Sequence, residues 1–389
     1  MDYSLTEEQE MVRDLARRVA REKVLEKAAE LDEREEFPWD LLREMASSDL
    51  FAVSMPEEYG GMGGGVFDLC LVMEEISWAC SAVAVSYAAS WLGSAPILIA
   101  GSDEQKQKYL PGLATGQRLA AFALTEPEAG SDAGGIQTVA ARDGDDYVLN
   151  GTKQWITNGG EAEVYTVIAL TDPKKGPRGA SAFIVEKGTP GFTFGKKEKK
   201  MGIRASATRE MAFQDCRVPR ENLLGKEGMG FIVAMKTLDK ARPGVGAQAV
   251  GVAQGALDRA VEYATVRKQF GQPISSFQAV GHMLADMATQ VEAARALVYS
   301  VARMIDSGCK SYSKESAMAK LFASDVAMRV ATDALQVFGG YGYMRDYPME
   351  KIMRDAKITQ IYEGTNQIQR NVIAQELVKE SRSRGQKGR

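Results

Sequence analysis

Apolar residues recur at helical spacing through the first third of the chain. Thr6 and Gln9 form a capping-box sequence, and the apolar positions after them recur at helix spacing, at Met11, Val12, Leu15, Ala16 and Val19. A loop with five glycines, PEEYGGMGGG at residues 56–65, separates further apolar segments. The pattern predicts a helical domain over residues 1–120.

From about Ala121 the sequence becomes typical of β-strands. The segment YVLNGTKQWIT (147–157) has Asn-Gly between two β-prone runs, which predicts a turn that joins two strands. Further strands are predicted at 164–170, 181–186 and 210–215. These segments predict a compact β-domain over residues 121–230.

After Gly230 the helical period returns over longer stretches. Residues 277–305 carry apolar side chains at every third or fourth position, over roughly eight turns of helix, and such a length favours a helix bundle. A second helix is predicted to end at Gly339, and the last helix contains residues 368–377. Residues 231–389 therefore predict a helical bundle, and we expect the tail SRSRGQKGR to be disordered.

Composition narrows the classes of partner. The chain has 389 residues, of which 45% are hydrophobic, and its formal net charge of -4 gives no basic excess for binding a nucleic-acid backbone. Apolar runs such as Ile97–Ala100 are too short to span a bilayer, and the N-terminus MDYSLTEEQE has no cationic apolar leader. We expect a cytoplasmic protein with neither a nucleic-acid partner nor membrane insertion, although a trimmed organellar enzyme would have the same features.

Candidate chemistry is restricted by what the sequence contains. Its four cysteines form no CxxC pair, and its single histidine, His282, lies in an amphipathic string and is interpreted as structural. These residues indicate no metal site and do not favour a Ser-His-Asp triad. The sequence also lacks GxGxxG and GxxxxGK[ST] motifs. An enzyme of this composition would depend on a carboxylate and a cofactor.

One carboxylate stands out at a junction, in the string ITQIYEGTNQIQR (358–370). Thr365 is placed to cap the last helix, which leaves Glu363 and Gly364 in the turn before it. Gly364 allows an unusual backbone angle and close approach of a ligand to the main chain. Glu363 could favour the helix N-terminus by its charge or act as a catalytic base, and the local sequence leaves both open.

The chain contains five separated strings, in this order: ALTEPEAGSD, LNGTKQWITNG, RKQFGQPISSFQ, QVFGGYGY and MRDAKITQIYEGTNQIQR. Together they resemble segments of acyl-CoA dehydrogenases, and the resemblance extends from the first helix to about Val378. Two further strings, KKMGIRAS and TLDKAR, are most similar to the short-chain, butyryl-CoA type of these enzymes.

This resemblance implies an α+β multidomain fold, with an N-terminal helical domain, a β-barrel-like middle domain and a C-terminal four-helix bundle. It implies FAD bound between the last two domains, and α,β-dehydrogenation of an acyl-CoA to the trans-2-enoyl-CoA. Electrons would leave to an electron-transfer flavoprotein, and the assembly would be a homotetramer. Two alternatives stay open: an acyl-CoA oxidase or flavin monooxygenase of the same fold, and a non-catalytic relative.

By the same resemblance Glu363 is the base that takes the α proton of the substrate. Burial beside Tyr362 and an acyl chain would raise its pKa and make it more basic. The resemblance places the thioester oxygen against the backbone N–H of Glu363, and Gly364 would let the main chain come close. Some relatives carry the base on an earlier helix, at the position that is Ala241 in this sequence.

Other site residues follow from the matched motifs. Trp155 resembles the side chain packed against the isoalloxazine and Thr157 the hydroxyl near flavin N5; otherwise they would be ordinary strand residues. Thr125 and Ser131 belong to a loop that meets flavin and pantetheine, and a generic loop is the alternative. Asp239 and Arg242 resemble a pair that contacts CoA, whereas an arginine beside a proline can also be a solvated helix start.

The remaining matched residues imply a cofactor shared between subunits. One group resembles side chains that hold the FAD pyrophosphate and adenosine of a neighbouring subunit, where a guanidinium offers forked donors to a pyrophosphate. Two further residues match contacts on the adenosine side. The first group is Arg267, Phe270, Gln278, Gln336 and Gly340; the second is Thr365 and Gln367.

The segment SYAASWLGSAP (86–96) matches the helix that builds the floor of the acyl pocket. Ala84 and Ala88 are small, whereas Trp91 departs from the small residue expected in short-chain relatives. Trp91 could face outward, or it could close the pocket on four-carbon chains or stack on a branched or cyclic acyl group. Butyryl-CoA is the substrate that we expect.

Overall fold

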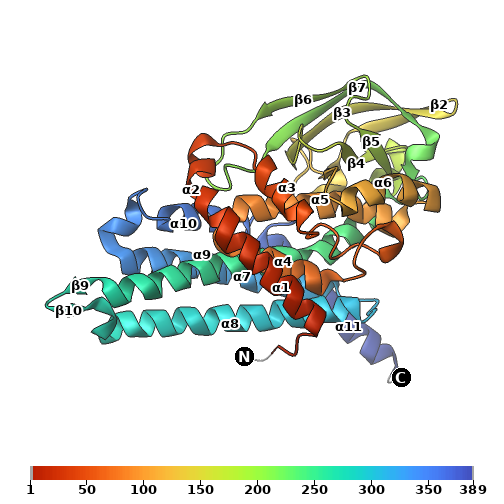
Figure 1. The fold of residues 1–389 in the computed structure, drawn as a ribbon. Coiled ribbons are helices and arrows are strands. Elements are labelled where there is room, and N and C mark those ends of the chain that lie inside the picture. Colours follow the sequence, from red (N-terminus) through yellow and green to blue (C-terminus); the bar gives the residue numbers. More distant parts are fainter. Residues whose placement is uncertain (1–2, 388–389) are drawn as a thin grey trace.

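The computed structural model describes residues 3–387, which form helices at the N-terminus, a β-sheet in the middle and a long helical bundle (Figure 1). The predicted capping box is present, because Thr6 Oγ1 accepts from the backbone N–H of Gln9, whose side chain accepts from that of Thr6. The N-terminal helices are α1 (Glu7–Val19), α2 (Leu25–Arg34), α3 (Trp39–Ser47), α4 (Val66–Ala79), α5 (Ser81–Ala100) and α6 (Asp103–Ala114).

The middle segment forms one eight-stranded sheet within the described chain, in the order β6-β7-β3-β2-β4-β5-β8, with β1 paired to β4 beside this path. β4 is buried along its whole length and pairs in parallel with β1 and β2 and antiparallel with β5. The strands are β1 (Ala120–Ala123), β2 (Val139–Asp143), β3 (Asp146–Thr157), β4 (Val164–Leu170), β5 (Ala180–Glu186), β6 (Phe192–Lys197), β7 (Thr208–Pro219) and β8 (Leu223–Leu224).

The turn predicted at Asn150 and Gly151 is wrong. β3 continues through both residues, and the flanking runs pair with the same strand, β7, across a register shift. The chain reverses instead at Gly144, between β2 and β3. Gly151 has φ +147°, and a Cβ there would lie 2.5 Å from Thr138 Oγ1. A glycine is therefore needed here because the main chain bulges and packs closely against Thr138, and not because the chain turns into a hairpin.

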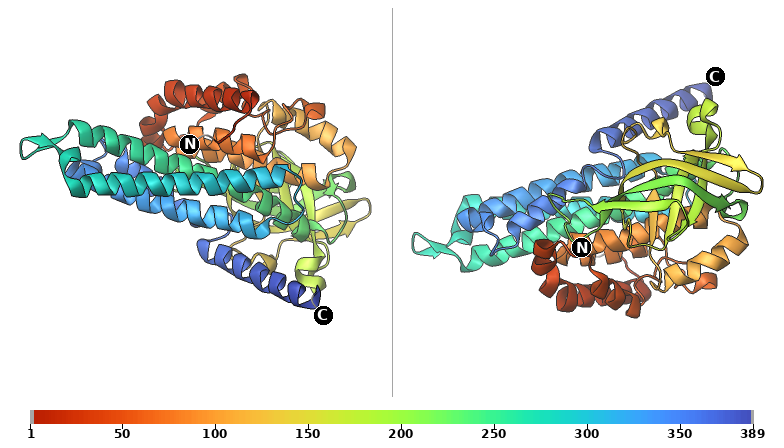
Figure 2. Two further views of the ribbon diagram at one scale, coloured as in Figure 1. Left: turned by 90° about the horizontal axis from the view of Figure 1, so that it is seen from below. Right: turned by 90° about the horizontal axis from the view of Figure 1, so that it is seen from above.

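The C-terminal part confirms the predicted bundle. α7 (Gly230–Val266), α8 (Gln278–Asp306) and α9 (Ser313–Phe338) pack together, and α10 (Met349–Ile358) packs on α7 and α9. Figure 2 shows the short hairpin of β9 (Lys268–Gln269) and β10 (Gln272–Pro273) at the end of the bundle away from the sheet. The tail was predicted to be disordered, but α11 (Asn366–Lys387) continues into it. Residues 388–389 lie outside the described chain.

Helix α5 lies between the sheet and the bundle, where it packs on β1 and α7, and α4 packs on α7 and α8 of the bundle. By length and composition α5 could cross a membrane, so the expectation that the apolar runs are too short does not hold for the whole of Ser81–Ala100. Most of this helix is nevertheless buried in the fold, as in a core helix. The carboxylate of Asp306, at the end of α8, accepts from the backbone N–H groups of Val66 and Phe67 at 2.8 Å each, and so caps α4 across 240 positions of sequence.

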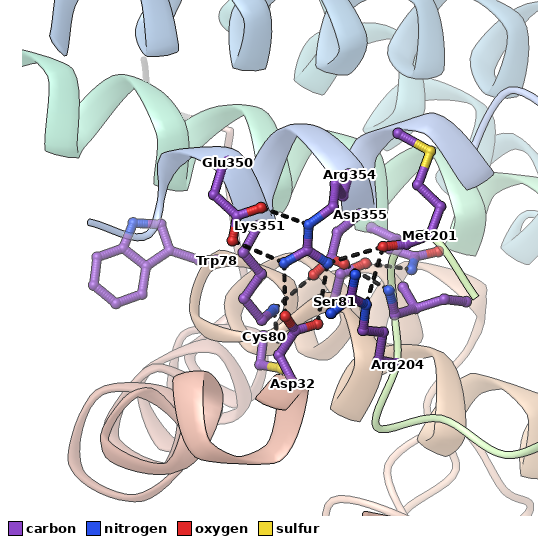
Figure 3. A network of polar contacts seen from close by, with 12 residues as sticks. Asp32, Trp78, Cys80, Ser81, Met201, Arg204, Glu350, Lys351, Arg354 and Asp355 are labelled. Atoms are coloured by element: carbon purple, nitrogen blue, oxygen red, sulfur yellow. Dashed lines mark hydrogen bonds and ion pairs between the residues drawn. The ribbon is translucent and has the colours of Figure 1, made fainter. Parts of the chain in front are cut away.

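A polar network joins the three parts of the chain around Arg354 of α10 (Figure 3). Its guanidinium contacts Asp32 of α2 at 2.6 Å and Glu350 at 2.6 Å, and it donates to the carbonyl of Met201 at 2.9 Å. The neighbouring Asp355 accepts from the backbone N–H of Ile203 at 2.6 Å. α10 leads directly into the Glu363 turn, so this network fixes the start of that turn relative to the other two parts.

Replacing Arg354 by alanine is expected to lower the free energy of unfolding by about 3 kcal/mol, because two largely buried carboxylates would lose their partner. Urea denaturation followed by circular dichroism measures this loss. Arg217 offers a matched control, since it also contacts two carboxylates, Asp143 and Asp146, but on an exposed surface. Arg217→Ala should cost less than about 1 kcal/mol. Equal losses would show that the Arg354 network does not hold the parts together.

Candidate functional site

A cavity of about 510 Å³ lies where α4, α5, α7, the 125–134 loop, the end of β3 and the turn after α10 meet. Eight of the residues predicted for the site line it: Thr125, Ser131, Trp155, Thr157, Arg242, Tyr362, Glu363 and Gly364. The fold therefore brings together side chains that are more than 230 positions apart in sequence. Ala241 also lines this cavity, so only a methyl group lies where some relatives carry the base.

Glu363 is a half-buried residue whose carboxyl group lines the cavity. Its Oε2 atom is inaccessible to solvent and has no hydrogen-bond partner within residues 3–387. Burial raises the pKa of Glu363 to about 7, and the positive charges of Arg242 and Lys320 oppose this rise. Near neutral pH the side chain can therefore hold or release a proton, as a general base requires.

The turn that carries Glu363 is held by its carbonyl groups. Gln369 Nε2 donates to the carbonyls of Glu363 at 3.2 Å and Gly364 at 2.9 Å. As predicted, Thr365 caps α11, because its hydroxyl accepts from the N–H of Ile368 at 3.2 Å. Over the described chain the backbone N–H of Glu363 donates to no other group. This N–H is available to a ligand oxygen.

Two more predicted residues are fixed by neighbours. The Tyr362 hydroxyl donates to Gln248 Oε1, and burial raises the pKa of this phenol well above its usual range, so it stays neutral. Arg242 is buried, contacts Asp239 at 2.5 Å and donates weakly to the carbonyl of Glu363 at 3.5 Å. The solvated helix start considered for Arg242 is therefore wrong. Asp239 does not line the cavity itself, but it contacts Arg242, which does.

Trp155 and Thr157 lie at the end of β3, and Trp155 has φ +60° and leaves 59% of its surface exposed. A buried ion pair, which the sequence analysis did not identify, ties this strand to the loop that carries Thr125 and Ser131. Lys153 Nζ contacts Glu126 at 2.6 Å and the carbonyl of Leu124 at 3.0 Å. The loop and the strand are therefore held as one unit.

These residues fit a flavin. An exposed indole on the cavity wall offers a flat apolar surface for an aromatic ring system, and the hydroxyls of Thr125, Ser131 and Thr157 border the same cavity. Trp155 would pack against the ring system, and Thr157 would donate to it. The interpretation of both as ordinary strand residues does not account for so large an exposed tryptophan beside a cavity.

The other predicted cofactor residues lie elsewhere. Arg267 and Gly340 border a second hollow at the end of the bundle near β9–β10, and the Arg267 guanidinium lies 5.2 Å from the ring centre of Tyr341. The side chain of Phe270, at the tip of the β9–β10 hairpin, is 92% exposed. Three glutamines, Gln278, Gln336 and Gln367, are exposed, and Thr365 is half-buried. Within one subunit these groups do not reach the Glu363 cavity.

Sequence reasoning missed Lys320 of α9. It is fully buried, and its Nζ lies 2.9 Å from the carbonyl of Gly364 and 2.8 Å from Asn366 Oδ1. A lysine on the apolar face of the 313–338 helix is the signal that could have identified it. His282, which the sequence indicated to be structural, is exposed on α8 and does not line the cavity. Three of the four cysteines are buried, and Cys309 is half-buried.

Three family descriptions match successive parts of this chain. "Acyl-CoA dehydrogenase, N-terminal domain" matches residues 6–117, the middle domain matches 121–216 and the C-terminal domain matches 228–378. The chain belongs to the acyl-CoA dehydrogenase family. The resemblance found in the sequence is thus confirmed, and as a member of this family the protein is an FAD-dependent oxidoreductase.

Relatives of this acyl-CoA dehydrogenase match it over nearly their full lengths. "Acryloyl-CoA reductase (NADH)" of Anaerotignum propionicum is 52% identical over 381 residues, 97% of this chain and 96% of its own. The structure of butyryl-CoA dehydrogenase from Megasphaera elsdenii is 48% identical with a TM-score of 0.95, covering 97% of this chain and 100% of that one. A chain solved in work on the electron transferring flavoprotein of Acidaminococcus fermentans and flavin-based electron bifurcation is 52% identical with a TM-score of 0.95, covering 97% and 99%.

Proposed function

We propose that this acyl-CoA dehydrogenase oxidises short-chain acyl-CoA thioesters to trans-2-enoyl-CoA, with Glu363 as the base. The observation that carries the proposal is the carboxyl group of Glu363, which has a pKa of about 7 and lines the same cavity as the exposed indole of Trp155; its Oε2 atom is shielded from solvent and has no hydrogen-bond partner within residues 3–387. FAD, when bound, would supply the acceptor for the hydride that leaves the β carbon. The residues of the chain would transfer the proton, bind the thioester and exclude water from the cavity.

The proton step belongs to Glu363. Its carboxylate would take the proton from the α carbon, while the free backbone N–H of Glu363 would stabilise the negative charge that develops on the thioester oxygen. Gly364 allows this N–H to face the substrate. Arg242 and Asp239 would contact the CoA portion. Because both protonation states of Glu363 are populated near neutral pH, the same residue could return a proton to an enoyl-CoA, in the direction that the name of the acryloyl-CoA reductase relative describes.

Trp91 supports the short-chain assignment. Of its two interpretations, outward facing is wrong, because the side chain is 5% exposed and lines the cavity. Ala88 of the same helix and Leu69 and Met73 of α4 continue an apolar wall. Among the described lining residues Arg242 provides the positive charge, and it is already paired with Asp239. The wall therefore favours a short apolar acyl group over a dicarboxylic one.

The partners, the assembly and the location are also part of the proposal. An electron-transfer flavoprotein would accept the electrons, as the flavoprotein context of the Acidaminococcus fermentans relative supports. A homotetramer would place Arg267, Phe270, Gln278, Gln336 and Gly340 against the FAD of a neighbouring subunit, and Thr365 and Gln367 would contact the adenosine side of FAD. The division at residues 120 and 230 and the cytoplasmic location remain predictions.

Anaerobic bleaching of the flavin tests this function. Butyryl-CoA is expected to bleach the flavin fastest in a panel of straight, branched, cyclic and dicarboxylic acyl-CoAs. If none of the panel reduces the flavin, the protein is not an acyl-CoA dehydrogenase in function.

Trp91→Ala should open the acyl end of the cavity. We expect the ratio of kcat/KM for octanoyl-CoA to that for butyryl-CoA to rise at least about 10-fold, because each added methylene that finds apolar contact contributes about 0.8 kcal/mol. Trp91→Phe is the control: it keeps a bulky ring and removes an indole N–H that has no partner in the described chain. An unchanged ratio in Trp91→Ala would show that Trp91 does not limit chain length.

A further inference from the structure

Lys320 has an unusual environment for a buried cation. It and Lys153 are both fully buried, but Lys153 contacts a carboxylate, Glu126, at 2.6 Å. The hydrogen-bond partners of Lys320 are two neutral oxygens, the Gly364 carbonyl and Asn366 Oδ1. Burial of an ammonium without an ion pair costs several kcal/mol, so stabilising the fold is a poor reason for a lysine at this position.

The position of Lys320 relates it to the base. Both of its partners belong to the turn from Glu363 to Asn366, and the Gly364 carbonyl is one residue beyond Glu363. Lys320 and Gln369 anchor this carbonyl from two helices, α9 and α11. These two contacts fix the main chain directly after Glu363 against α9 and α11.

Charge connects Lys320 to the same residue. Two cations, Lys320 and Arg242 of α7, act on the Glu363 carboxyl and favour its ionised form against burial. The pKa of Lys320 is in turn lowered to about 7, chiefly by burial; the carboxylate of Glu363 opposes this fall, the charge of Arg242 adds to it and Asp325 opposes it. Lys320 and Glu363 thus ionise over the same range of pH, and each influences the other.

We propose that Lys320 is a positioning residue for proton abstraction, which holds the Glu363 turn against α9 and favours the carboxylate form of Glu363 by its charge. This inference rests on the proposed role of Glu363 as the base. It assigns Lys320 no contact with substrate or flavin. Its effect passes through the geometry and the ionisation of Glu363.

Two variants separate the two contributions. Lys320→Met removes the charge and the hydrogen bonds, whereas Lys320→Gln removes the charge and keeps a donor. The measurement is the rate of anaerobic flavin reduction by butyryl-CoA across roughly pH 6–9. In the wild type this rate should rise with pH through about 7, as Glu363 loses its proton.

In both variants the pH at which the rate of flavin reduction rises should be higher by at least about 0.5 unit than in the wild type, because a nearby positive charge no longer favours the carboxylate of Glu363. The plateau rate should fall at least about 10-fold in Lys320→Met and less in Lys320→Gln, because only the former frees the turn. Lys310→Met, the same change at an exposed lysine before α9, should alter neither quantity.

The outcomes are distinct. If the wild type is not bleached by any acyl-CoA, the proposed function fails whatever Lys320 does. If the wild type is bleached and the rate rises at the same pH in both variants, the inference about Lys320 is overturned. If neither variant accumulates as a folded flavoprotein, Lys320 only supports the fold, and the inference is overturned as well.

Discussion

Glu363→Gln is expected to bind FAD normally and to lose about 10⁴-fold in the rate of flavin reduction by butyryl-CoA. The amide has the size of the carboxyl group but no basicity, and general base catalysis contributes up to this amount. Because Glu363 Oε2 has no hydrogen-bond partner in the described chain, the substitution breaks no contact of that atom. Anaerobic stopped-flow spectroscopy at the flavin absorbance measures the rate.

Two controls make this result specific. Glu363→Asp keeps a carboxylate but shortens the side chain by one methylene, and it should retain partial activity, about 100-fold below the wild type. Glu262→Gln makes the same amide substitution at an exposed position of α7 and should leave the rate unchanged. If Glu363→Gln turned over at the rate of the wild type, another group would have to take the proton.

Gly364→Ala is expected to reduce flavin about 100-fold more slowly than the wild type while FAD stays bound. Gly364 has φ +94°, where an L side chain is strained, and its Cβ would lie 2.6 Å from Gln369 Nε2. Gln369 holds the carbonyls of Glu363 and Gly364, so its displacement would move the base. A misplacement of about 1 Å in a reacting group costs on the order of 100-fold in rate.

Gly144 offers a matched control for Gly364. It also has a left-handed φ, of +61°, but nothing lies within 4 Å of its Cβ position, in the turn between β2 and β3. Gly144→Ala should cost about 1 kcal/mol of stability, seen in urea denaturation, without a change in flavin reduction. Similar rates in Gly364→Ala and the wild type would show that the turn tolerates displacement and that close approach of the main chain is not needed.

The helices were the best-predicted part of the fold, because their apolar periods are long. α8 was expected at 277–305 and is Gln278–Asp306. The strands were less predictable, since β1, β2, β6 and β8 are short or partly exposed and have little pattern of their own. Asn-Gly at 150–151 has the sequence of a hairpin turn, and only its pairing with β7 on both sides shows that the chain runs straight on.

The site was predicted unevenly for a related physical reason. Residues in continuous motifs, such as Trp155 and Glu363, could be matched one by one, and the cavity contains them. Lys320 and Gln369 act through contacts with main-chain carbonyls, which carry no signature in a sequence. The environment of Trp91 depends on the packing of α5 against other elements, so the segment alone could not decide which way the ring faces.

The Asp306 cap on α4 has a consequence for synthesis of the chain. Val66 and Phe67 leave the ribosome 240 positions before the carboxylate that accepts from their backbone N–H groups. At ordinary rates of translation this interval is roughly 10–50 s. Throughout it α4, which is largely buried in the finished fold, lacks the α7 and α8 surfaces that cover it, and the apolar α5 lacks that of α7. The nascent N-terminal third is therefore the segment of this chain with most to gain from a holdase chaperone.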